Sequence, residues 1–167
     1  TVYDNLEKKQ DTVFDFLKKG GIDPSEISLA APKVNDTLAN NYGPNRPPFR
    51  YIITQVITIA TDKVDTVRKL MEAQRELLKQ GVALTNDYSY MINYSFTGLN
   101  EIKPKMIEIA TKNAKEAAKK FAEDSGSKLG KIRRANQGVF SITDRDDNTP
   151  FIKNVRVVTT VEYFLND

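Results

Sequence analysis

The chain has 167 residues, within the range of about 100 to 200 residues typical of one domain, so we expect a single domain over residues 1–167. Its 25 basic and 22 acidic residues give a formal charge of +3, a mild excess compared with the dense basic surface of nucleic-acid-binding proteins. It contains no Cys and no His, which excludes thiol catalysis, disulfides and metal sites built from thiolate or imidazole groups.

The first third of the chain predicts a helix followed by two strands. Apolar residues at helical spacing favour a helix over residues 2–19, and Gly20-Gly21 then supplies residues that tolerate the left-handed conformation ending a helix. Residues 27–34 and 51–60 have strand-like patterns, and the second carries apolar or β-branched side chains on both faces. We expect these two strands to pair antiparallel.

The middle of the chain predicts a second helix and a strand. An apolar stripe at helical spacing begins after a cap at Thr61 or Asp62 and ends at Gly81. Residues 82–96 then alternate between apolar or aromatic and polar side chains, which is typical of a strand with one dry and one wet face. The aromatic residues of the dry face are Tyr88, Tyr90, Tyr94 and Phe96.

The last third of the chain predicts a long helix followed by two strands. The spacing of residues 104–124 predicts a helix with a largely alanine face toward the core, and Ile109 and Phe121 belong to the same face. The small alanine side chains would let this helix approach a sheet closely. Residues 131–143 and 151–165 have strand patterns on either side of a polar loop.

The resulting element order is α-β-β-α-β-α-β-β. Helices separated by pairs of strands and by one single strand favour an α+β fold, in which a mixed, mainly antiparallel sheet carries its helices mostly on one face. The apolar runs are far shorter than the roughly 18 residues that predict a membrane-spanning helix. We therefore expect no transmembrane segment.

The polar loop between the last two strands carries the opening of a calcium-binding loop. Asp144, Asp146 and Asn148 stand at alternate positions and offer the oxygen ligands that a hard cation prefers. Thr149 and Val155, however, replace the glycine and the bidentate glutamate that such a loop requires. The sequence favours a solvated hairpin loop with these three residues as the candidates for a metal, and we expect no cofactor.

The loop between the first two strands is suited to a protein contact. Residues 40–48 are rich in proline and asparagine, and the loop and its end carry Tyr42, Arg46 and Phe49. Aromatic and arginine side chains are enriched at the centres of protein interfaces. We expect these three residues to contact a partner, the alternative being a plain connection between paired strands.

The aromatic face of residues 82–96 permits a second interpretation. Aromatic residues on a strand can stack on nucleic-acid bases, and basic residues further along the chain would supply positive charge. These basic residues are Lys128, Lys131, Arg133 and Arg134. Aromatics spaced two residues apart more often pack beneath a helix, and the alanine-faced helix is available to cover them. We therefore expect no nucleic-acid partner.

Three stretches of sequence carry a family resemblance. The run GIDPSEI occupies residues 21–27, a strand from Tyr51 leads into the helix that ends at Gly81-Val82, and the alanine-rich helix ends in SGSKLGKI at 125–132. Together they resemble the SIMPL-domain family, also known as DUF541 and as YggE-like oxidative-stress defence proteins. The resemblance covers nearly the whole chain. Such proteins place a strand before the first helix, so we expect this N-terminal strand to be missing here.

The resemblance implies a bacterial cell-envelope protein, exported to the periplasm, that forms homo-oligomers or binds protein partners and has an indirect role in oxidative-stress defence. It supplies no catalytic residue, and we expect a protein that is not an enzyme. The alternative is a small-molecule or metal-ion-binding module that uses a cleft beside the loops at 40–48 and 144–150.

Overall fold

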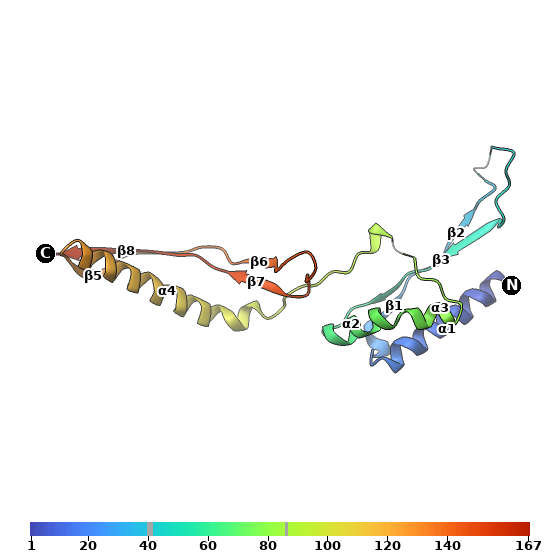
Figure 1. Ribbon diagram of the computed structural model, residues 1–167, viewed down its shortest axis with the longest axis horizontal. Coiled ribbons are helices and arrows are strands. Elements are labelled where there is room, and N and C mark those ends of the chain that lie inside the picture. Colours follow the sequence, from blue (N-terminus) through green and yellow to red (C-terminus); the bar gives the residue numbers. More distant parts are fainter. Residues whose placement is uncertain (40–41, 86) are drawn as a thin grey trace. The chain divides into compact units, whose positions relative to one another are not determined.

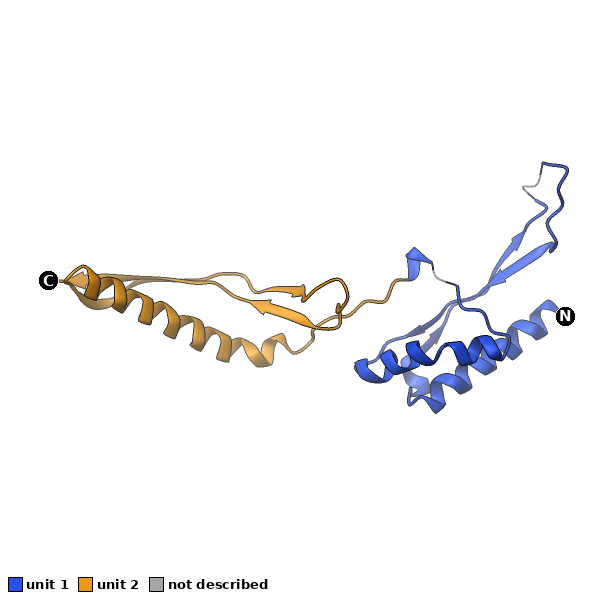
Figure 2. Ribbon diagram, in the orientation of Figure 1, with its two compact units in different colours: residues 1–90 blue, residues 91–167 orange. Residues whose placement is uncertain are grey.

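The computed structural model describes residues 1–39, 42–85 and 87–167 (Figure 1). The chain divides into two units, Thr1–Tyr90 and Met91–Asp167 (Figure 2). Each unit combines helix with antiparallel strands, which confirms the α+β class. The strands of the described residues pair as four two-stranded ladders rather than as one sheet. That the two units form one domain stays a prediction from the sequence.

Unit 1 contains the first helix, a long β-hairpin and a pair of helices. The helices are α1 (Val2–Lys19), α2 (Val64–Ala73) and α3 (Arg75–Lys79), with 3-10 turns η1 (Pro24–Glu26) and η2 (Tyr88–Tyr90). The strands are β1 (Ile27–Leu29), β2 (Lys33–Asp36), β3 (Tyr51–Thr54) and β4 (Ile57–Ile59). The antiparallel pairing of the two predicted strands is confirmed, with β1 on β4 and β2 on β3.

Three predicted elements of unit 1 are interrupted in the structure, one of them the predicted strand over residues 51–60, which divides into β3 and β4. The first predicted strand divides into β1 and β2, and the side-chain amide of Gln55 donates to the Ala30 carbonyl at 2.8 Å in the gap between the ladders. The predicted second helix divides at Gln74, whose N–H bonds three residues back to Met71 instead of four. All three interruptions preserve the chain direction that the sequence predicts.

The core of unit 1 is built from two helix ends. After α1, Gly21 has a φ of +99°, and the N–H of Ile22 donates to the Leu17 carbonyl at 3.0 Å. After α3 a glycine with a φ of +80° precedes Val82, whose N–H donates to the Leu77 carbonyl at 2.9 Å. At each helix end the hydrogen bond joins an apolar residue inside the helix to one just beyond it. The side chains of all four residues, Leu17, Ile22, Leu77 and Val82, are buried.

The prediction of a strand over residues 82–96 is wrong for the described part of that segment. The chain there contains the 3-10 turn η2 and is otherwise irregular, and Asn86 lies outside the described residues. A strand needs a neighbour to bond its backbone groups, and no ladder of the described residues includes this segment. Tyr88 is exposed, so the aromatic residues do not form one covered face.

Unit 2 contains one long helix and a second β-hairpin. Its elements are α4 (Leu99–Asp124), β5 (Lys128–Gln137), β6 (Ser141–Asp144), β7 (Lys153–Arg156) and β8 (Thr159–Asn166). β5 pairs antiparallel with β8, and β6 with β7. The two predicted strands are thus confirmed as the arms of a hairpin. α4 begins five residues before the predicted start, and Pro104 lies inside it.

α4 lies alongside the ribbon of β5 and β8 (Figure 1). Its half-buried and buried residues include a row that recurs every four positions: Ile102, Met106, Ala110, Ala114, Ala118 and Ala122. The prediction that Ile109 and Phe121 belong to the buried face is wrong, because both are exposed. A ribbon two strands wide covers only a narrow strip of a helix, and these two side chains fall outside that strip. No helix in the described ranges combines the length and apolarity needed to cross a membrane.

Candidate functional site

The predicted contact loop extends from the end of the β2–β3 ladder. Tyr42 and Phe49 are 96% and 72% exposed, and Arg46 is exposed as well. The base of the loop is fixed, because the Thr37 hydroxyl donates to the carbonyl oxygen of Arg50 at 3.0 Å. Asn40 and Asn41 lie outside the described residues. The structure therefore presents all three candidate residues to solvent, while their contact with a partner stays a prediction.

Exposed apolar side chains continue from this loop along the β2–β3 ladder and recur in unit 2. In unit 1 they include Val34, Tyr51 and Ile52. In unit 2 they include Phe121, Ile132, Val139, Phe164 and Leu165. By contrast, the buried hydrophobic residues among those that the structure describes are only Val13, Leu17, Ile22, Leu77, Val82 and Ala122.

The accessible surface of the chain is large for its mass. It amounts to 13283 Å² for 18.9 kDa. Two separate compact units of this combined mass would expose about 10,000 Å². The chain thus exposes on the order of 3,000 Å² more than compact units would, which exceeds the roughly 1,200 to 2,000 Å² buried in a standard protein interface.

Of the three metal candidates, Asp146 and Asn148 lie in the hairpin loop between β6 and β7, and Asp144 is the last residue of β6. The Asp146 carboxylate accepts the Thr149 hydroxyl at 2.6 Å, the Arg145 Nε–H at 2.9 Å and the Asn148 N–H at 3.0 Å. The Thr149 hydroxyl, followed by Arg145, lowers the pKa of Asp146 to about 2. Asp144 pairs with the Lys153 ammonium. These contacts fold the loop on itself, as the hairpin interpretation predicts.

No cluster of three acidic side chains suited to a metal occurs within the described ranges. In the loop itself, both oxygens of Asp146 already accept hydrogen bonds from neighbouring residues. A cation at this position would have to compete with Arg145 and Thr149 for them. The geometry accordingly favours a closed turn over a cation site.

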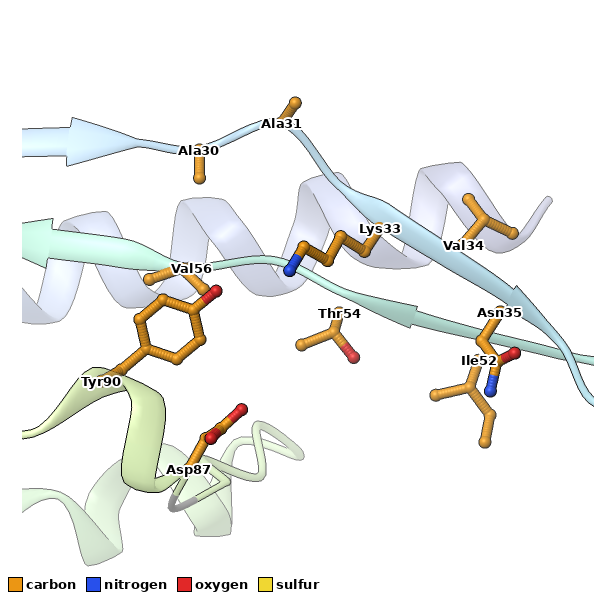
Figure 3. Close-up of a pocket in the computed structure, with 10 residues that line it drawn as sticks. All are labelled: Ala30, Ala31, Lys33, Val34, Asn35, Ile52, Thr54, Val56, Asp87 and Tyr90. Carbon is orange, nitrogen blue, oxygen red and sulfur yellow. The ribbon is translucent and has the colours of Figure 1, made fainter.

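A groove of about 390 Å³ lies in unit 1, where the hairpin passes the η2 turn (Figure 3). Asp87 and Tyr90 stand on one side of it, and Lys33 belongs to the ribbon on the other side. Hydrogen bonds from Ser89 lower the pKa of Asp87, and the positive charge of Lys33 contributes in the same direction. The residues that line the groove include none from either loop at 40–48 or 144–150.

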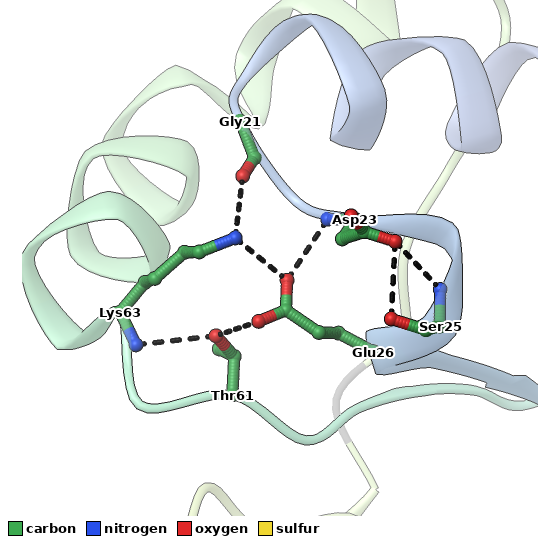
Figure 4. A network of polar contacts seen from close by, with 6 residues as sticks. All are labelled: Gly21, Asp23, Ser25, Glu26, Thr61 and Lys63. Atoms are coloured by element: carbon green, nitrogen blue, oxygen red, sulfur yellow. Dashed lines mark hydrogen bonds and ion pairs between the residues drawn. The ribbon is translucent and has the colours of Figure 1, made fainter.

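A polar network that the sequence analysis missed joins three segments of unit 1 (Figure 4). The Glu26 carboxylate accepts the Asp23 N–H at 2.8 Å, the Thr61 hydroxyl at 2.8 Å and the Lys63 ammonium at 3.0 Å. Lys63 also donates to the Gly21 carbonyl at 3.2 Å. The spacing of Asp23 and Glu26 is a detectable capping-box signal, whereas the partners from the α2 entry are remote in sequence.

The network has a consequence for stability against acid. The Asp23 N–H, then the Thr61 hydroxyl and the Lys63 ammonium, hold the pKa of Glu26 below its ordinary value. A carboxyl group whose pKa is lower in the folded chain stabilises the fold above its unfolded pKa, and this contribution is lost as the pH falls through the folded pKa.

We therefore expect Glu26→Gln to unfold at lower urea concentration than the parent at pH 7, with a difference that shrinks once the pH is below about 4. The measurement is the urea midpoint at both pH values. Glu72→Gln is the matched control, since Glu72 is exposed, and it should leave the midpoint unchanged. A Glu26 effect of equal size at both pH values would show that the ionised carboxylate is not what stabilises this junction.

The arrangement defines the class of protein: an α+β chain in which two units each combine helix with a long β-hairpin. Residues 1–163 match the family model SIMPL, described as a protein of unknown function (DUF541). The chain therefore belongs to the SIMPL family, as the sequence motifs predict. No curated protein matches it.

Proposed function

We propose that this SIMPL-family protein is a non-enzymatic, self-assembling component of the bacterial cell envelope. Its membership of a family of unknown function leaves its activity open. The observation that carries the proposal is the accessible surface, which exceeds that of compact units by on the order of 3,000 Å². Large apolar side chains are among those exposed on this surface. Exposed apolar patches are typical of protein–protein contact sites.

The chemistry of the side chains supports a role without turnover. A peroxide-reducing enzyme of the thiol type needs a reactive cysteine, and a redox metal is usually held by histidine or cysteine, both of which the sequence lacks. The three methionines are too few for a sulfur-based scavenger. We propose that any part in oxidative-stress defence is indirect, through assembly in the envelope, and that the protein resides in the periplasm, as the family resemblance implies.

Self-assembly predicts a discrete mass in solution. Light scattering coupled to size exclusion should give a whole multiple of 18.9 kDa that does not change on tenfold dilution. The double variant Tyr42→Ser, Phe49→Ser tests whether the exposed loop takes part, because it removes two solvent-exposed aromatic anchors without touching the core. A reduced mass would place the loop in the interface.

A mass of one chain at all concentrations would contradict the proposal. It would then favour the ligand-binding alternative, for which the groove beside Lys33, Asp87 and Tyr90 is the candidate surface. Its volume of about 390 Å³ lies in the range of small-molecule sites, about 300 to 1,000 Å³.

A further inference from the structure

The ribbon of unit 2 has two edges, and they differ in kind. β5 pairs only with β8 among the described strands, so each strand has one edge whose backbone groups face away from the ladder. Edges of this type recruit further strands unless charge, bulges or a covering segment prevents it. The residues of the two strands therefore indicate which edge accepts another chain.

The β5 edge carries two features that oppose strand addition. Four of its ten residues are basic and exposed: Lys128, Lys131, Arg133 and Arg134. The register with β8 shifts twice, between Leu129 and Ile132 and again between Ile132 and Arg134, because β5 carries an extra residue each time. Bulges of this kind twist an edge and disrupt its hydrogen-bonding pattern. Two β5 edges would also repel each other through their like charges.

The β8 edge carries neither feature. Its sequence, TTVEYFLN, contains one charged residue, Glu162, which stands opposite Arg134 on the ribbon. The strand alternates half-buried and exposed residues from Thr159 through Phe164, so its backbone is regular. Phe164 and Leu165 are exposed apolar side chains at its end. β-branched and aromatic residues, which favour pairing with a further strand, make up most of β8: Thr159, Thr160, Val161, Tyr163 and Phe164.

Resting on the proposed self-assembly, we propose that the free edge of β8 pairs antiparallel with β8 of a second copy about a two-fold axis. The pairing joins two ribbons into one sheet of four strands, with the basic β5 strands at its outer edges. The same strand serves both sides of a two-fold contact, so the contact must be self-complementary. A nearly uncharged strand meets that condition, whereas the basic β5 does not.

The register of this pairing is limited by Glu162. In an antiparallel pair about a two-fold axis, the central residue stands opposite its own copy. Centring on Glu162 would oppose two carboxylates, which is unfavourable. Centring on Val161 or Tyr163 instead places Glu162 opposite Thr160 or Phe164 of the second copy. We expect one of these two registers.

A pair of matched variants tests which edge is used. Thr160 and Asn136 stand opposite each other on the ribbon, and both are exposed. Thr160→Lys and Asn136→Lys therefore introduce the same charge at the same position along the ladder, the first on β8 and the second on β5. We expect Thr160→Lys to lower the solution mass by about a factor of two, because lysine on an edge opposes strand addition. Asn136→Lys should leave the mass unchanged.

Single cysteines give a second readout in a chain that has none of its own. A cysteine at the central residue of a two-fold antiparallel pair stands directly opposite its copy, close enough for a disulfide. Mild oxidation of Val161→Cys and Tyr163→Cys should give a covalent dimer from one of them. Cysteine at Arg133 or Asn136 on β5 should give none. Circular dichroism checks that each variant is folded.

The outcomes separate this proposal from the proposed function. An oligomer whose mass falls with Thr160→Lys alone, together with a β8 cross-link, supports both. An oligomer that responds to Asn136→Lys, or to neither lysine variant, with no β8 cross-link, overturns the β8 pairing and leaves self-assembly standing. A parent chain that is monomeric by light scattering overturns both.

Discussion

Leu77→Ala is expected to lower the unfolding free energy of unit 1 by about 2 to 5 kcal/mol, the usual cost of removing a fully buried leucine side chain. Leu77 is 2% exposed and belongs to the small cluster of buried residues that forms the core of this unit. Few other buried contacts are available to compensate. Urea unfolding followed by circular dichroism measures the change in unfolding free energy. If the loss exceeds the stability of unit 1, this unit will be unfolded at 25 °C even without urea.

The neighbouring leucine provides the control. Leu78 is 66% exposed, so Leu78→Ala makes the same chemical change on the same helix without emptying a core position. We expect the unfolding free energy of this variant to stay within about 0.5 kcal/mol of that of the parent, as is usual for surface substitutions. Equal effects of the two substitutions would mean that Leu78 is covered in solution, for example by a second copy, and dilution would distinguish that case.

Gly138→Ala is expected to destabilise the hairpin of unit 2 by about 1 to 3 kcal/mol, the usual cost of overpacking. Gly138 follows β5, and its N–H donates to the Val158 carbonyl at 2.8 Å. A Cβ added at this position would lie 2.7 Å from the same carbonyl oxygen. The oxygen belongs to the backbone of the opposite arm of the hairpin, just before β8, so relief of the clash requires the two arms to move apart.

Gln137→Ala is the control for this substitution. Gln137 is the preceding residue and is exposed, so the change should have little effect on the thermal midpoint. Replacing glycine by alanine also stabilises a fold by about 0.4 to 1 kcal/mol through the unfolded chain where no clash occurs. A Gly138→Ala protein as stable as the parent would therefore mean that moving the two arms apart costs only about 0.4 to 1 kcal/mol, just enough to cancel this gain, and would contradict the expected net destabilisation.

The features that the sequence predicted correctly are determined by short stretches of chain. The ends of α1 and α3 follow from glycines that adopt positive φ, and the antiparallel arms of both hairpins follow from their residue patterns. The exposure of Tyr42 and Phe49 follows from a loop too polar and proline-rich to be buried.

The features that the sequence did not predict depend on remote partners. Residues 82–96 alternate like a strand, yet alternation cannot supply the neighbour that a strand requires. Glu26 meets Lys63 across 37 positions of sequence, which no local motif encodes. Phe121 is exposed because the adjoining ribbon is two strands wide, a width that the pattern of α4 does not report.

The position of the unit 1 core has a consequence for its cooperativity. Helix ends normally fray first, with opening free energies far below that of the whole fold. Here the hydrogen bonds that close α1 and α3 join four of the five buried residues of the core, Leu17 with Ile22 and Leu77 with Val82. Fraying of the C-terminal end of α1 or of α3 would expose the core to water. We therefore expect the opening of these helix ends and the global unfolding of unit 1 to be a single event.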